Sequence, residues 1–183
     1  RLAIKDEDKY IGIDNERIEW NYVEPISTKE IEKDINLMSN ILSTGLTKKI
    51  CISLMISSTR NQDHILIINE LLKRNNKYTG IIFNQSGVSV KKINKVTNLI
   101  NTTSSYKSIS EALSETLKTT KYIVIVAGLK ASRGISFVDQ EYKFHLTDLY
   151  LRSDYDFKNP TKHCESLIQK LRILGKYGKE DNL

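Results

Sequence analysis

The sequence has few cysteines and no long hydrophobic run, and both features restrict what the protein can be. Only two of its 183 residues are cysteine, Cys51 and Cys164, and neither lies at a spacing typical of zinc ligands. We therefore expect no metal site, and we expect both thiols to be reduced and buried in an intracellular protein. No run approaches the roughly 18 apolar residues of a membrane helix, and no secretory signal is visible, so we expect no membrane partner.

Several motifs that identify enzymes are also missing. The sequence contains no G-x-x-x-x-G-K-[S/T] nucleotide-binding loop and no G-x-G-x-x-G dinucleotide fingerprint. Its histidines, His64, His145 and His163, are scattered and form no Ser/His/Asp order, so we interpret them as structural or exposed. A free-standing enzyme with a Rossmann-like fold is consequently the weakest interpretation of this chain.

What the sequence does contain is typical of one globular domain. Hydrophobic residues make up 39% and charged residues 27% of the chain, and there is no internal repeat or low-complexity tract. The formal net charge is +6, which permits binding to nucleic acid without demonstrating it.

Apolar runs alternate with amphipathic segments, and this pattern predicts an α/β fold built on a parallel sheet. We predict a loop over Asn84–Val90 and a short strand or helix over Val96–Ile100. The predicted strands are Ile50–Ile56, Thr79–Phe83, Tyr122–Ala127 and Tyr142–Leu151; the predicted helices are Thr28–Ser43, Gln62–Arg74, Ser108–Leu117 and one that opens at Asn159.

Polar loops follow three of these strands. They are Ser57–Asn61, Asn84–Gly87 and Gly128–Ser136. In parallel α/β sheets, ligands bind outside the carboxyl ends of the strands. These loops are therefore the candidate binding segments.

The first loop, Ser58-Thr59-Arg60-Asn61, leads directly into a predicted helix. Free N–H groups at a helix N-terminus attract phosphate, and an arginine beside them would add to that attraction. The alternative is that Ser58 or Thr59 simply caps the helix.

The third loop follows the most apolar strand, in the stretch KYIVIVAGLKASRGISF. Gly128 and Gly134 would let the backbone approach a ligand closely. Lys130 and Arg133 would contact phosphates, the arginine through a two-pronged contact. The alternative is a solvated basic loop.

The predicted last helix contains Gln169, Arg172 and Gly175 at spacings that place the first two on one face. An arginine presented in this way can reach a nucleotide bound by a neighbouring domain. The alternative is an ordinary exposed helix face.

Taken in order, the three segments resemble the second, C-terminal RecA-like domain of superfamily 2 helicases, over most of Lys48 to Gly178. Ser58-Thr59-Arg60 after ICISLMI is similar to motif IV. VAGLKASRGISF is similar to motif V, with Arg133-Gly134-Ile135 at its centre, and QKLRILGKYG is similar to motif VI. The resemblance implies a RecA-like parallel sheet flanked by helices on both faces.

Motif VI departs from the usual pattern, Gln-x-x-Gly-Arg-x-x-Arg. Arg172 stands three residues after Gln169, and Leu171 replaces the glycine. The shorter spacing is similar to that in Z1-type and some viral or phage helicase-like ATPases, Gln-x-Gly-Arg-x-x-Gly.

The resemblance implies a function for the whole protein. This chain would be the C-terminal half of an ATP-dependent DNA helicase or translocase of a virus or mobile element, acting in replication or repair in the host cytoplasm or nucleus. Residues 1–27 would connect two RecA-like domains, and residues 28–183 would form the second. No acidic DEAD- or DEAH-like stretch accompanies the missing nucleotide-binding loop. ATP and Mg²⁺ would therefore be bound mainly by the N-terminal RecA-like domain of the same protein, and this chain alone should be inactive.

The resemblance also implies roles for individual residues. Arg172 would stabilise charge on the γ-phosphate, with Gln169 as a polar sensor beside it. Nucleic acid, single-stranded or duplex and preferably DNA, would be the other partner. The implied nucleotide contacts are Gly128, Arg133, Gly134 and Gly175; the implied nucleic-acid contacts are Ser58, Thr59, Arg60, Asn61, Lys130, Ser132 and Ser136. The alternative is a non-catalytic RecA-like module that binds nucleic acid or a partner protein.

Overall fold

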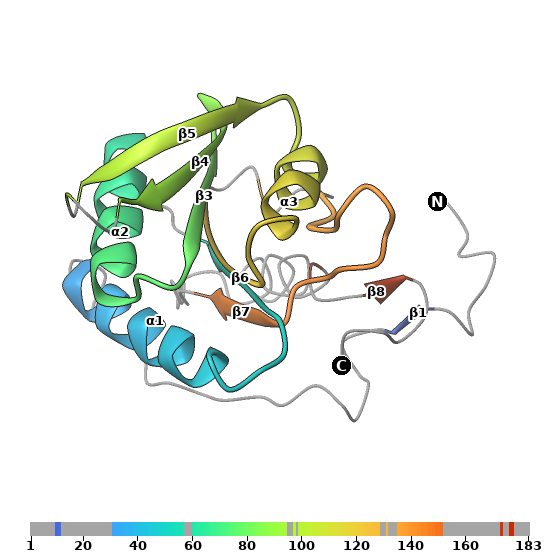
Figure 1. Ribbon diagram of the computed structural model, residues 1–183, viewed down its shortest axis with the longest axis horizontal. Helices are drawn as coiled ribbons and strands as arrows, with labels where there is room; N and C mark the ends of the chain where they lie inside the picture. Colours follow the sequence, from blue (N-terminus) through green and yellow to red (C-terminus); the bar gives the residue numbers. More distant parts are fainter. Residues whose placement is uncertain are drawn as a thin grey trace, which may run out of the picture.

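The computed structural model describes residues 10–11, 31–56, 60–94, 97, 99–128, 131, 135–151, 173 and 176–177. These residues form an α/β structure whose centre is a six-stranded mixed sheet (Figure 1). The strand order is β5-β4-β3-β6-β2-β7, and a separate antiparallel pair joins β1 to β8. The strands are β1 (Tyr10–Ile11), β2 (Cys51–Ile56), β3 (Thr79–Asn84), β4 (Gly87–Ile93), β5 (Ile100–Tyr106), β6 (Tyr122–Ala127), β7 (Asp148–Leu151) and β8 (Lys176–Tyr177). The helices are α1 (Ile31–Gly45), α2 (Asn61–Arg74) and α3 (Ile109–Leu117).

Four neighbouring strands, β3, β6, β2 and β7, are parallel. The central strand β6 is buried along its whole length after Tyr122, because helices cover both faces of the sheet. This explains why its sequence is one apolar run rather than an alternation. The α/β fold with helices on both faces, predicted from the sequence, is confirmed and is compatible with a RecA-like arrangement.

The two faces of the sheet contribute to two separate hydrophobic clusters. Met55, Val124 and Val126 pack with α1 and α2 on one face. Leu54 and Ile125 pack with α3 on the other. Successive residues of a strand point to opposite faces, so each parallel strand supplies both clusters.

Helix α2 packs very closely on the sheet at Gly80 of β3. A Cβ atom at this position would lie 2.6 Å from Ile68 Cγ1 and 3.1 Å from Leu72 Cδ1. No side chain fits in that space, so the glycine sets the depth at which α2 packs.

The predicted loop over Asn84–Val90 is wrong beyond its first residues. A two-residue turn closes a hairpin there, with Asn84 Oδ1 accepting the Ser86 N–H at 2.8 Å and Gly87 in the left-handed region at φ 113°. The chain then runs back as β4, and β5 pairs antiparallel beyond it. Strand β5, with the sequence INTTSSY, was not predicted as a strand after Ile100, because an exposed edge strand shows no apolar alternation.

The predicted strand over Tyr142–Leu151 is also wrong in its first half, because β7 covers only Asp148–Leu151. Asp139 holds the preceding residues in a loop: its carboxylate accepts the Phe144 N–H at 2.7 Å and the Glu141 N–H at 3.3 Å. Tyr142 takes a positive φ of 57°, which no strand residue adopts.

The short strand or helix predicted over Val96–Ile100 is wrong: among the described residues of that range, Thr97 lies in a turn and only Ile100 belongs to a strand, as the first residue of β5. The remaining predicted helices and strands in the described part of the chain agree with the structure to within a few residues, α2 and α3 included. The helix predicted to open at Asn159, and Cys164 within it, lie outside the described residues. None of the helices in the described part of the chain is both long and apolar enough to span a membrane.

Candidate functional site

Strands β2, β3 and β6 end on the same side of the sheet, which we call the carboxyl edge. Gly128 follows β6 there, and its N–H donates to the carbonyl of Phe83 in β3 at 2.9 Å. The Ala131 N–H donates to the Gly128 carbonyl at 2.9 Å, so the chain turns tightly after the strand. Ala131 is fully buried, which anchors the turn in the core.

The loop that starts at Gly128 also returns to Phe83. Ile135 is half-buried against the core, and the ring of Phe137 stacks edge-on against the ring of Phe83 with centroids 6.0 Å apart. Ser136 is exposed between these two anchored residues. Both ends of the loop over residues 128–136 are thus held beside the end of β3.

Helix α2 begins at the carboxyl edge. Its N-cap residue is Arg60, whose backbone N–H donates to Asp63 Oδ2 at 3.0 Å. The alternative interpretation, that Ser58 or Thr59 caps the helix, is therefore wrong, because the capping position lies after both. The Arg60 side chain is exposed and Asn61 is half-buried, so both can be reached from solvent.

The charge of Asp63 weakens one part of the predicted phosphate site. A carboxylate in the first turn offsets the positive potential of the helix N-terminus, and this one also occupies a backbone N–H. The arginine, rather than the helix dipole, is consequently the stronger feature for an anion at this end of α2.

These segments lie close to a histidine, His64, whose place in the sequence indicates only a structural or exposed residue. His64, in the first turn of α2, is 1% exposed. Its Cε1 atom lies 3.2 Å from where a Cβ on Gly128 would stand, and Asn84 Cβ lies 3.9 Å from the same point. The start of α2, the end of β3 and the turn after β6 therefore meet around Gly128. The sequence contains one signal of this proximity: His64 lies in the first turn of the helix that follows a predicted strand.

Only some of the predicted site residues can be placed. The structure brings Gly128 together with the helix that Arg60 and Asn61 begin, and it places Ser136 at the far end of the loop from Gly128. The remaining candidates lie outside the described residues: Ser58, Thr59, Lys130, Ser132, Arg133, Gly134, Gln169, Arg172 and Gly175. Among the residues that are described, no group of His, Cys, Asp and Glu side chains has an arrangement that would hold a metal ion.

Comparison with known proteins adds no relative. No family model matches the chain, and neither a curated protein nor a solved structure matches it. The chemistry of the site is therefore argued from its own residues.

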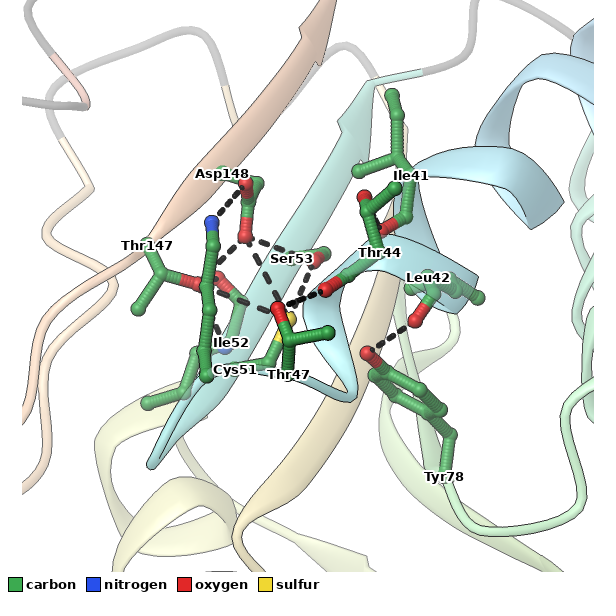
Figure 2. A network of polar contacts seen from close by, with 11 residues as sticks. Ile41, Leu42, Thr44, Thr47, Cys51, Ile52, Ser53, Tyr78, Thr147 and Asp148 are labelled. Atoms are coloured by element: carbon green, nitrogen blue, oxygen red, sulfur yellow. Dashed lines mark hydrogen bonds and ion pairs between the residues drawn. The ribbon is translucent and has the colours of Figure 1, made fainter. Parts of the chain in front are cut away.

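A second polar cluster lies at the opposite, amino end of β2 (Figure 2). Asp148 of β7 is its centre: Oδ2 accepts from Thr147 Oγ1 at 2.7 Å, Ser53 Oγ at 3.3 Å and Cys51 Sγ at 3.5 Å. Lys48 Nζ contacts the other oxygen, Oδ1, at 2.6 Å. We call these five residues the Asp148 cluster.

The Asp148 cluster is suited to stability rather than to catalysis. Burial raises the pKa of the Cys51 thiol. Hydrogen bonds with Ser53 and Tyr78 offset part of this rise, and the charge of Asp148 adds a smaller increase. A thiol held protonated is a poor nucleophile. Burial, followed by the hydrogen bond with Cys51, also raises the pKa of Tyr78, whose hydroxyl donates to the Leu42 carbonyl at 2.8 Å.

Proposed function

We propose that this chain is the C-terminal RecA-like half of an ATP-dependent nucleic-acid helicase or translocase, acting inside a cell on DNA. One observation supports this more than any other. Because β6 lies between β2 and β3, the segment that resembles motif V starts in contact with the helix that follows the motif IV segment. If both segments contact the same strand of nucleic acid, they must lie next to each other in this way.

In this proposal the carboxyl edge faces the nucleic acid and the nucleotide. Arg60 contacts a backbone phosphate, and Asn61 supports it from the start of α2. The loop over residues 128–136 supplies backbone N–H groups and Ser136 to the same strand. Such contacts read the sugar-phosphate backbone rather than the base sequence.

ATP and Mg²⁺ are bound mainly by an N-terminal RecA-like domain, and this chain completes their site. Arg172 supplies positive charge to the γ-phosphate in the transition state, and Gln169 senses its presence. Gly128, Arg133, Gly134 and Gly175 lie along the nucleotide in this arrangement. The chain by itself hydrolyses no ATP, so robust turnover by the isolated chain contradicts the proposal.

The test compares two cations at opposite ends of α2. Arg60→Ala removes an exposed charge at the carboxyl edge, and Lys73→Ala removes one from the last turn of the same helix. The two lie thirteen residues apart, or about 20 Å along the helix axis. Fluorescence anisotropy with a labelled single-stranded oligonucleotide, measured over a range of salt concentrations, gives the affinity and its salt slope.

We expect Arg60→Ala to lower the affinity severalfold and to reduce the magnitude of the salt slope by about 0.7, the value for one phosphate contact to a single strand. Lys73→Ala should leave both quantities close to those of the unchanged chain. Equal effects of the two variants would mean that binding depends on net charge alone, which removes the support for a site at the carboxyl edge.

A non-catalytic RecA-like module remains the second candidate, and one observation favours it. Asp63 places a negative charge beside Arg60, where a phosphate is expected. The discriminating variant is Arg172→Ala in the full-length protein. Loss of ATP hydrolysis with retained DNA binding supports the helicase, whereas unchanged hydrolysis supports the module.

A further inference from the structure

The ring of His64 lies next to Gly128, the residue that follows β6. A Cβ built on Gly128 would stand 3.2 Å from His64 Cε1, which is tighter than most contacts of real Cβ atoms. Both residues are buried, and Asn84 at the end of β3 adjoins Gly128. A side chain on Gly128 would therefore have to push the imidazole aside.

The backbone does not explain the glycine at this position. Of the glycines described, only Gly87 has a φ in the left-handed region, so Gly128 adopts a conformation open to any residue. The His64 ring, rather than the backbone geometry, is what a side chain there would meet.

His64 differs from the other inward-facing residues of α2 in its position. Ile67, Ile68 and Leu71 are apolar and buried in the core on the α1 side of the sheet. His64 lies one turn closer to the carboxyl edge, where its ring stands beside Gly128, the first residue after β6.

We propose that His64 is a positioning residue that fixes the start of α2 against the loop over residues 128–136. The ring keeps Arg60, one turn before it, at a set distance from the turn that begins at Gly128. The start of α2 and the end of β6 then meet one nucleic-acid strand at a fixed spacing. This inference rests on the proposed function, and it assigns to His64 no contact with the ligand itself.

The test uses His64→Ala with Ile67→Val as the matched control on the same helix. Ile67 is equally buried, but it lies one turn further from the carboxyl edge, in the core on the α1 and α2 side. Oligonucleotide affinity is measured well below the melting temperature of each variant, together with amide hydrogen exchange at Ala131 and Ile135. We expect His64→Ala to weaken binding at least fivefold and to speed exchange at both amides. Ile67→Val should lower thermal stability but leave affinity within twofold.

The double variant Gly128→Ala/His64→Ala supplies an internal check. Gly128→Ala alone should lower the melting temperature because its methyl group meets the ring. In the His64→Ala background, Gly128→Ala should lower the melting temperature much less. An equal decrease in melting temperature in the two backgrounds would overturn the steric argument.

The outcomes separate this inference from the proposed function. If the unchanged chain binds DNA and His64→Ala neither weakens binding nor speeds exchange, the positioning role is wrong while the function stands. If the unchanged chain fails to bind DNA, the proposed function is wrong, and with it the role of His64 in binding. Faster amide exchange in His64→Ala would then show only that the ring stabilises the turn after β6.

Discussion

Replacing Asp148 with alanine tests whether the Asp148 cluster stabilises the sheet through hydrogen bonds or through its ion pair. The carboxylate accepts from Thr147, Ser53 and Cys51 on one oxygen and contacts Lys48 on the other. Ser53 and Cys51 are fully buried, whereas the Lys48 side chain is 43% exposed. The two kinds of interaction therefore lie in different surroundings and should differ in magnitude.

The exposed ion pair should contribute little. Solvent screens it, so Lys48→Ala should lower the free energy of unfolding by less than about 1 kcal/mol. Asp148→Ala leaves the buried groups of Ser53 and Cys51 without their acceptor, and hydrogen bonds to a charged group contribute about 1.5–3 kcal/mol. We expect Asp148→Ala to cost about 2–4 kcal/mol, since these bonds share one oxygen and do not add fully.

Urea unfolding followed by far-ultraviolet circular dichroism measures both variants. Each should shift the midpoint without changing the slope, because neither alters the surface exposed on unfolding. Asp148→Asn retains an acceptor oxygen, so its unfolding midpoint should lie between those of Lys48→Ala and Asp148→Ala. If Lys48→Ala costs as much as Asp148→Ala, the ion pair dominates and the hydrogen-bond explanation is wrong.

Two further predictions concern packing and pH. Gly80→Ala should lower the free energy of unfolding by about 1–3 kcal/mol, because the new methyl group would lie 2.6 Å from Ile68 Cγ1; a neutral result in urea unfolding would show that α2 shifts freely. The free energy of unfolding should also fall as the pH rises above about 9. Burial keeps Cys51 and Tyr78 protonated in the folded chain beyond their ordinary pKa values of 9.0 and 10.0, so the unfolded chain binds fewer protons there. The double variant Cys51→Ala/Tyr78→Phe should show a shallower decline between pH 9 and 11, and an unchanged decline would contradict this cause.

The parallel core could be predicted from the sequence because burial leaves a clear pattern. Strand β6 is covered on both faces and reads as an uninterrupted apolar run. Helix α3 places its apolar residues on one side, and α2 does so except for the exposed residues Ile65 and Leu66. Strand β5 could not be predicted, because its polar, largely exposed residues match neither pattern. The loop before β7 could not be predicted for a different reason. The side chain of Asp139 holds it through local hydrogen bonds, while its apolar residues are typical of a strand.

The site was only partly predictable. The sequence locates the ends of β2, β3 and β6, but it does not say which strands are neighbours. That β6 lies between the other two is a property of the strand order. The proximity of His64 to Gly128 follows from this order, since the two residues are far apart in the sequence and adjacent only in the folded chain.

The place of β6 has a consequence for how the chain folds during synthesis. Strands β2 and β3 emerge from the ribosome before β6, yet each pairs in parallel with β6, which ends at Ala127. Until that residue is made, two apolar strands lack the strand that pairs between them, and their exposed edges can bind other chains. A product that stops after α3 would contain β2 and β3 but not β6, the strand that joins them in the parallel core, so it should aggregate rather than fold.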